Sequence, residues 1–172
     1  MPVQSFLPHA VITGAFQKGW QGPTLAGCLR GITPAQALKR PGKGRKCIWE
    51  QVLHAAYWKY AVTRILMHAA DPAAAEAMQA FPRSPSNWPR LPEVPDAKAW
   101  KRDIALLKQC QYNLEAVVES LADADLSQRP SLKHKHTLAF YIAGAAAHDA
   151  YHTGQIQLLK RLWREPEHKG RR

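Results

Sequence analysis

The sequence is poor in cysteine, with only Cys28, Cys47 and Cys110 among its 172 residues. Their number is odd, their spacing is wide, and no CxxC pair occurs. This pattern argues against a disulfide framework and against a thiolate zinc site, and it favours a reducing compartment. We therefore expect a cytoplasmic protein.

Long apolar runs are missing as well. No run reaches the roughly 18 residues that a membrane-spanning helix needs. The stretch MPVQSFLPHAVITG lacks the basic start and the apolar block of a signal peptide. A soluble protein without a membrane partner is the expectation that follows.

Acidic residues are absent from residues 1–46, which contain seven Lys or Arg, whereas residues 47–128 contain eight basic and ten acidic residues. The formal net charge of +11 favours anionic partners. Because no nucleic-acid-binding motif accompanies the charge, a solvated basic surface is the favoured explanation, and nucleic acid is not an expected partner. The segment KRPGKGRK at 39–46 is predicted to be a linker loop that can meet a phosphate or a carboxylate.

Hydrophobic residues make up 46% of the chain, which is enough for one core. We predict a single domain over residues 1–165, followed by a basic tail at 166–172. Helical patterns cover four long and two short segments: 3–19, 48–69, the segment from Asp96 to Leu121, 137–163, and the short pieces 24–30 and 34–39. Thr33 and Asp96 are the predicted N-caps of two of them, with Pro34 at a first helical position.

Proline is concentrated in one place, since residues 70–95 hold six of the 13 prolines. Such a segment is predicted to be a long, extended crossover. No strand pattern occurs. The predicted fold class is therefore all-α, a four-helix bundle with a long Pro-rich crossover between helices two and three.

A stripe of residues runs along segment 137–163 in steps of three and four, and is predicted to face the bundle interior. Its members are Leu138, Tyr141, Ala145, His148, His152, Gln155, Leu159 and Leu162. Two histidines four residues apart can both reach one metal ion. Two core histidines with hydrogen-bond partners are the other interpretation. Asp149 lies about 100° from the His148 stripe and is predicted at the flank of the helix, away from the metal.

A third histidine, His54, lies in the apolar run VLHAAYWKYAV, one helical turn after Glu50. On its own it fits an ordinary core histidine bonded to a carbonyl or a tyrosine. Together the three imidazoles suit a borderline ion such as Zn²⁺ or Ni²⁺ and leave positions open, as catalytic metal sites do. Glu50, three residues after Cys47, is predicted either to cap its helix or to act as a catalytic proton acceptor beside His54.

Four stretches of the chain resemble the DinB-like (DinB/YfiT) family of metalloenzymes, in the order of that family and over almost the whole chain: AFQKGWQGPTLAGCLRGITPAQALKRP, IWEQVLHAAYWKYAV, NWPRLPE and HDAYHTGQIQLLKRLW. The resemblance implies a four-helix bundle, often a homodimer, with a divalent metal ion on one histidine of helix two and an HxxxH pair of helix four. Those positions match His54, His148 and His152. Many relatives have a histidine within the segment that is Trp-Gln-Gly-Pro at 20–23 here, and a serine in place of Cys47.

The resemblance further implies transfer or isomerisation reactions with low-molecular-weight thiols. An ion on three neutral ligands keeps its charge and lowers the pKa of a bound water or thiol. The predicted function is therefore a metal-dependent hydrolase or thiol S-transferase that acts on a small molecule, with Zn²⁺ or Ni²⁺ as first candidates and Fe or Mn as further ones. The alternatives are a non-catalytic metal-binding or stress-response module and, least favoured, a basic nucleic-acid-binding protein.

Three further side chains are candidates for lining a pocket beside the metal, namely Tyr57, Tyr151 and Gln155. For the two tyrosines, packing in the core is the alternative. The remaining histidines are assigned no function, and these are His9, His68, His134, His136 and His168.

Overall fold

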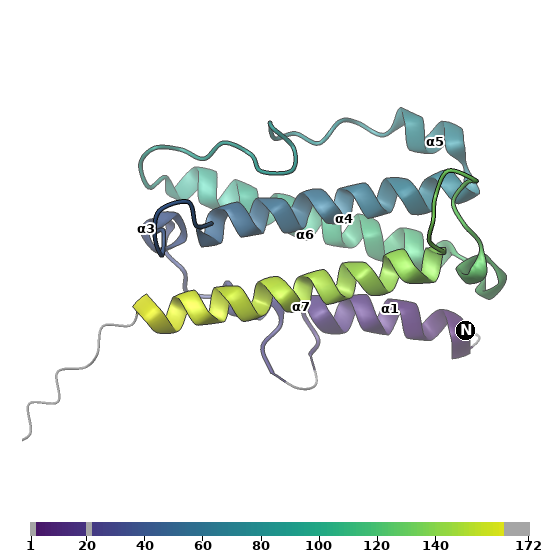
Figure 1. Ribbon diagram of the computed structural model, residues 1–172, viewed down its shortest axis with the longest axis horizontal. Helices are drawn as coiled ribbons and strands as arrows, with labels where there is room; N and C mark the ends of the chain where they lie inside the picture. The colour runs from purple at the N-terminus through teal and green to yellow at the C-terminus, as the bar shows by residue number, and fades with distance from the viewer. Residues whose placement is uncertain (1–2, 20–21, 164–172) are drawn as a thin grey trace, which may run out of the picture.

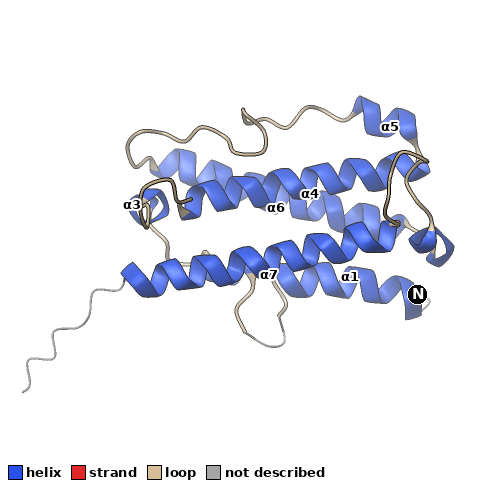
Figure 2. Ribbon diagram, viewed as in Figure 1, coloured by secondary structure: helices blue, strands red, loops and turns tan. Residues whose placement is uncertain are grey.

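Four long helices form the framework of the protein (Figure 1). They are α1 (Val3–Phe16), α4 (Ile48–Ala70), α6 (Ala97–Ser120) and α7 (Leu138–Trp163). Short helices lie between them: α2 (Leu25–Cys28), α3 (Pro34–Leu38), α5 (Pro72–Ala77) and the 3-10 helix η1 (Asp123–Ser127). The computed structural model describes residues 3–19 and 22–163, and within these ranges every regular element is a helix (Figure 2). The all-α prediction is confirmed.

Two of the helices, α3 and α6, begin where the sequence predicts, because side chains satisfy their free N–H groups. Thr33 accepts a hydrogen bond from the N–H of Gln36 at 3.2 Å, and the Gln36 side chain accepts from the N–H of Thr33 at 2.9 Å. Asp96 accepts from the N–H groups of Lys98 and Ala99 at the start of α6. This confirms the N-caps predicted for Thr33 and Asp96.

The long helices pack as a bundle in which α4 and α1 each contact both α6 and α7. Buried side chains fill the bundle in two clusters. One surrounds Trp49 and Trp100, whose rings meet edge to face with centroids 5.0 Å apart. The other, toward the far end of α4, contains Leu66 and Leu114. In the described residues, no helix combines the length and the apolar character needed to cross a membrane.

The crossover between α4 and α6 differs from its prediction in one element, because residues 72–77 form the short helix α5. Asp71 accepts a hydrogen bond from the N–H of Ala74, Pro72 lies at the first helical position, and three alanines follow, so a local helix forms despite the nearby prolines. The chain then continues without a helix as far as Asp96 and runs back alongside α4 (Figure 1).

The buried face of α7 is rotated from the predicted stripe. Its buried residues are Leu138, Ile142, Ala146, Asp149, His152, Thr153, Ile156 and Leu159. Of the predicted stripe, His148 and Gln155 are half-buried and Leu162 is 64% exposed. The physical reason is that α7 packs against α1 and α4 at once, so its buried face is centred between these two helices.

Asp149 was predicted at the helix flank, and that prediction is wrong. Its side chain is 1% exposed and pairs with Lys59 of α4, with Nζ 2.5 Å from Oδ2. Lys59 is 3% exposed. A buried carboxylate needs such a partner, and the partner lies 90 residues away in the sequence, where helical spacing within α7 gives no sign of it.

A second buried carboxylate, Asp103, accepts a hydrogen bond from the indole N–H of Trp49 at 2.8 Å. Replacing Trp49 by phenylalanine is expected to lower the free energy of unfolding by about 1–3 kcal/mol, because the carboxylate then loses a buried donor. Urea denaturation followed by circular dichroism measures this loss. Trp58→Phe, at a position 42% exposed, is the control and is expected to change stability by less than about 0.5 kcal/mol. Equal effects of the two changes would contradict the assignment.

Candidate metal centre

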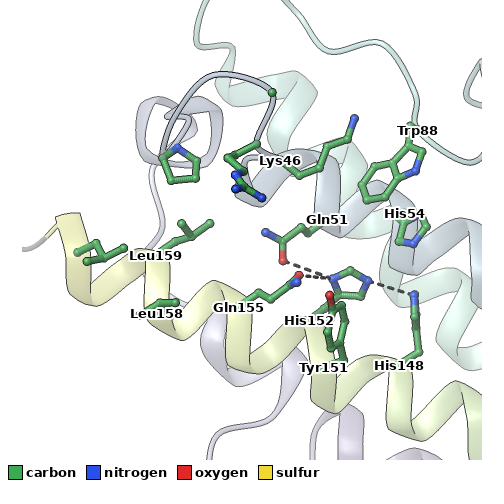
Figure 3. Close-up of a pocket in the computed structure, with 14 residues that line it drawn as sticks. Lys46, Gln51, His54, Trp88, His148, Tyr151, His152, Gln155, Leu158 and Leu159 are labelled. Carbon is green, nitrogen blue, oxygen red and sulfur yellow. Dashed lines mark hydrogen bonds between the residues drawn. The ribbon is translucent and has the colours of Figure 1, made fainter.

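The bundle brings three histidines from two helices together. His54 comes from α4, whereas His148 and His152 lie one turn apart on α7. Their ligand nitrogens all lie within 4.8 Å of one another. The Nε2 atoms of His148 and His152 are 3.0 Å apart, and a dashed line joins these two side chains in Figure 3. The three histidines named from the sequence thus form one cluster.

Two of the imidazole rings are oriented by hydrogen bonds from Nδ1. His54 Nδ1 lies 3.0 Å from the carbonyl oxygen of Asn87, to which it donates. His152 Nδ1 lies 3.3 Å from the Gln51 side-chain oxygen and 3.2 Å from that of Gln155 (Figure 3). A proton on Nδ1 leaves Nε2 of each ring with its lone pair free, which is the form that binds a metal ion.

The Pro-rich crossover completes the surroundings of His54. Trp88 stacks on the His54 ring with centroids 3.8 Å apart and an interplanar angle of 4°. Sequence reasoning missed Gln51, Asn87 and Trp88 as site residues. The available signals were the NWPRLPE stretch that carries the family resemblance and the position of Gln51, three residues before His54 on the same helix.

All three imidazoles are held in the neutral state. Burial, together with the neighbouring imidazoles, lowers the pKa of His148 to about 3. Burial lowers the pKa of His152 to about 4, with His54 contributing in the same direction. The pKa of His54 is also lowered, mainly by burial. Neutral imidazole is the ligand form, so near pH 7 the cluster needs no deprotonation before it binds a cation.

An open cavity of about 710 Å³ lies beside the histidines. It is lined by Pro41, Gly44, Arg45, Lys46, Gln51, His54, Trp88, His148, Tyr151, His152, Gln155, Leu158, Leu159 and Leu162. Tyr151 and Gln155 therefore lie where the sequence predicted a pocket. Tyr57 does not line this cavity, and its ring packs against Trp58 and against Phe81 of the crossover, which agrees with the alternative of packing in the core.

Glu50 is buried and has three partners. Its carboxylate lies 2.7 Å from Nη1 of Arg40 and 3.1 Å from Nζ of Lys46, and it accepts from the N–H of Cys47 at 3.0 Å. Burial opposes its ionisation, but these hydrogen bonds outweigh burial and lower the pKa of Glu50. The predicted helix cap is confirmed, whereas the catalytic role of Glu50 stays a prediction.

The other described histidines do not extend the cluster. His9 pairs with Glu119 at 2.9 Å, and His134 Nδ1 lies 2.8 Å from the hydroxyl of Ser131. Within residues 3–19 and 22–163, the triad is the one group of three or more metal-ligating side chains that meet closely enough to share an ion. His168, the tail at 166–172 and positions 20 and 21 lie outside the described residues.

The two histidines of α7 have a spacing that suits a shared divalent ion. Nitrogens bound to Zn²⁺ lie about 2.0–2.1 Å from it, so two of them at an angle of about 90–110° are roughly 3.0–3.4 Å apart. The separation of 3.0 Å between the Nε2 atoms of His148 and His152 agrees with that range. Three protein ligands leave at least one coordination position, and the adjoining cavity gives a small molecule access to it.

Comparison with known proteins gives a family match over most of the chain. A sequence model of the DinB superfamily matches residues 20–156. The matched range includes all three histidines of the cluster and the crossover that carries Asn87 and Trp88. No curated protein and no solved structure shows a significant match.

Proposed function

The chain belongs to the DinB superfamily, and from this premise we propose that it is a metal-dependent enzyme acting on a small molecule. In this proposal His54, His148 and His152 bind one divalent ion, with Zn²⁺ or Ni²⁺ preferred and Fe or Mn as further candidates. The observation that carries the proposal is the convergence of three neutral imidazoles from two helices at the wall of an open cavity.

When bound, the ion would act as a Lewis acid and lower the pKa of a water or of a low-molecular-weight thiol in the cavity. The chain contributes positioning. Asn87 and Trp88 hold the His54 ring, and Gln51 and Gln155 hold the His152 ring. Rings held in this way have their Nε2 atoms free to bind the ion, which is compatible with hydrolase or thiol S-transferase chemistry.

Turnover by the metal-loaded protein tests this function. One assay follows the attack of a thiol on 1-chloro-2,4-dinitrobenzene, in which the thiolate displaces chloride, and a second follows the hydrolysis of p-nitrophenyl acetate. We expect a rate with at least one substrate that disappears in His148→Ala. A rate that is unchanged in His148→Ala would show that the cluster takes no part in the reaction.

The side-chain amide of Gln155 is predicted to contribute to metal affinity by orienting the His152 ring. Gln155→Ala is expected to weaken metal affinity by about 10–100-fold, because the His152 ring loses one of its two hydrogen-bond partners. Competition with a chromophoric chelator measures the affinity. Gln157→Ala, two residues further along α7, is the matched control and should leave the affinity unchanged. Equal affinities of wild type and Gln155→Ala would remove Gln155 from the site.

One observation favours a second candidate, a metal-binding module without turnover. Among the described residues that line the cavity there is no Asp or Glu, so none of these side chains is a carboxylate that accepts a proton. In this alternative the metal binds with the same histidine dependence, while both assays show no rate above the metal-free protein.

We further propose that the protein is a homodimer. Large apolar side chains of α7 lie exposed on its surface, namely Phe140, Tyr151, Leu158 and Leu162, and the last three also line the cavity, so a partner chain would lie beside that cavity. Exposed apolar patches of this kind are typical of protein interfaces. Sedimentation equilibrium is expected to give twice the 19.3 kDa chain mass, and a shift toward 19.3 kDa in Leu158→Lys. A wild type that sediments as a monomer contradicts the proposal.

A cytoplasmic location is the last part of the proposal. Cys28, Cys47 and Cys110 are buried and not joined in disulfides, which agrees with a reducing compartment.

A further inference from the structure

We propose that the cavity beside the histidine triad selects small molecules that carry a carboxylate, and that Arg45 and Lys46 determine this selectivity. The inference rests on the proposed function and deepens it, since it names the chemical class of the molecule that meets the triad. Its basis is the distribution of charge around the cavity.

The charged residues that line the cavity are Arg45 and Lys46, and both are cations. Histidine binds a metal ion through neutral imidazole, so the three ligands would not offset the charge of a divalent ion held between them. Because no Asp or Glu occurs among the described lining residues, this cavity would hold a marked excess of positive charge. An anionic group on the bound molecule offsets that excess, whereas a cationic group is repelled.

Arg45 is the stronger of the two recognition residues. Its side chain is exposed, and among the residues that the structure describes it forms no ion pair. Its backbone is fixed, since the carbonyl oxygen of Arg45 accepts a hydrogen bond from Nη1 of Arg40 at 2.7 Å. A guanidinium group with free N–H donors on an anchored loop suits bidentate recognition of a carboxylate.

Lys46 is held at the edge of the cavity by two contacts. Its Nζ lies 3.1 Å from Glu50 and 4.5 Å from the centre of the Trp88 ring. The Glu50 carboxylate also pairs with Arg40. Its single negative charge therefore faces the two positive charges of Arg40 and Lys46, and one positive charge is left without a counterion. Figure 3 shows Lys46 on the side of the cavity opposite Tyr151 and Leu158.

The α7 side of the cavity indicates the rest of the ligand. It contains Leu158, Leu159, Leu162 and the ring of Tyr151, which are apolar surfaces. A molecule that fits both walls has an apolar body, a carboxylate directed at the loop of Arg45, and its reacting group at the histidines. Thiols with a terminal carboxylate combine these features in a small probe.

The test uses the full-length protein loaded with Co²⁺ and two thiols of matched length, 3-mercaptopropionate and 3-mercaptopropan-1-ol. The absorption band that appears when a thiolate binds Co²⁺ gives the Kd of each. We expect 3-mercaptopropionate to bind wild type at least about tenfold more tightly than the alcohol. In Arg45→Gln this preference should fall severalfold, and in the variant that also carries Lys46→Gln it should vanish, while the Kd of the alcohol stays the same.

Lys43→Gln is the matched control, because Lys43 lies in the same loop but does not line the cavity. It should keep the preference of wild type. Circular dichroism and the Co²⁺ affinity of each variant show whether it is folded, and Arg45→Gln is the decisive variant because the described Arg45 side chain has no structural ion pair to lose.

The outcomes separate the two proposals. If wild type does not bind Co²⁺, or binds it as well as His148→Ala does, both the proposed function and this inference are wrong. If the triad binds Co²⁺ but neither thiol binds, the two thiols bind equally, or the preference survives in Arg45→Gln/Lys46→Gln, only the carboxylate selectivity is wrong. A preference lost equally in Lys43→Gln also overturns it, since general surface charge then explains the effect.

Discussion

Replacing Lys59 by methionine is expected to lower the free energy of unfolding by about 3–5 kcal/mol, which is the usual cost of leaving a buried charge without its partner. Lys59 and Asp149 are 3% and 1% exposed, with Nζ 2.5 Å from Oδ2. The second oxygen of Asp149 has no hydrogen-bond partner in the described structure, so Lys59 supplies the compensation. Urea denaturation of the metal-free protein measures the change.

Two variants control this experiment. The double variant Lys59→Met/Asp149→Leu removes both charges and is expected to recover most of the lost stability, because a buried ion pair and an apolar pair of similar volume are often close in free energy. Lys101→Met, at an exposed position of α6, should change stability by less than about 0.5 kcal/mol. If Lys59→Met costs less than about 1 kcal/mol, the ion pair is not a main support of the fold.

The loss of unfolding free energy in Lys59→Met, relative to wild type, should also depend on pH. Burial raises the pKa of Asp149, and Lys59 acts against it. Without Lys59 the pKa of the folded carboxyl rises further above its unfolded value of about 3.9, so the folded variant binds more protons than the unfolded chain. The stability of the variant therefore falls as the pH rises from the unfolded pKa of Asp149 to its folded pKa. The deficit relative to wild type is expected to be smaller near pH 5 than near pH 8, and an equal deficit at both pH values would contradict this.

The ion pair matters for the site as well as for stability. Lys59 follows His54 by five residues on α4, and Asp149 is the residue after His148 on α7. The contact between them joins α4 to α7, the two helices that carry the histidines, close to the cluster.

The second large effect concerns metal-linked stability. Zn²⁺ at about 1,000 times its Kd is expected to raise the free energy of unfolding of wild type by about 4 kcal/mol, because the ion binds the folded chain at a preformed site. His152→Ala removes one ligand and should abolish this gain. Thermal unfolding with and without Zn²⁺ measures it. His136→Ala, whose ring stacks on Phe140 near the start of the same helix, is the control and should retain the full gain.

A gain in His152→Ala equal to that in wild type would place the ion elsewhere on the protein. The histidines at positions 134 and 136 are the natural alternatives, since they lie in an exposed His-rich segment. His136→Ala would then lose the gain that His152→Ala keeps. The pair of variants thus distinguishes the cluster from opportunistic surface binding.

The helices were predictable because their signals are local. Periodicity identified the four long helices, and the caps at Thr33 and Asp96 marked two of the starts. The short helix α5 was missed, since six prolines in 70–95 masked a local cap at Asp71. The true buried face of α7 depends on the two helices that it packs against, and that is a tertiary property.

The histidine cluster was predictable from the spacing of His148 and His152, together with His54 and the family resemblance. The residues that surround and orient these histidines were not predictable from the sequence. Asn87 and Trp88 lie in an irregular segment whose path along α4 has no periodic pattern, and the Lys59–Asp149 pair joins residues from different helices. Tyr57 packs against Phe81 of the crossover, and helical spacing does not reveal which face of α4 the crossover covers.

Elemental analysis of the protein purified without added metal shows whether the three histidines bind an ion. It compares wild type with His54→Ala and His152→Ala under identical purification. We predict about one divalent ion per chain in wild type and little or none in either variant. Near-stoichiometric metal in both variants would contradict the histidine triad as the metal site.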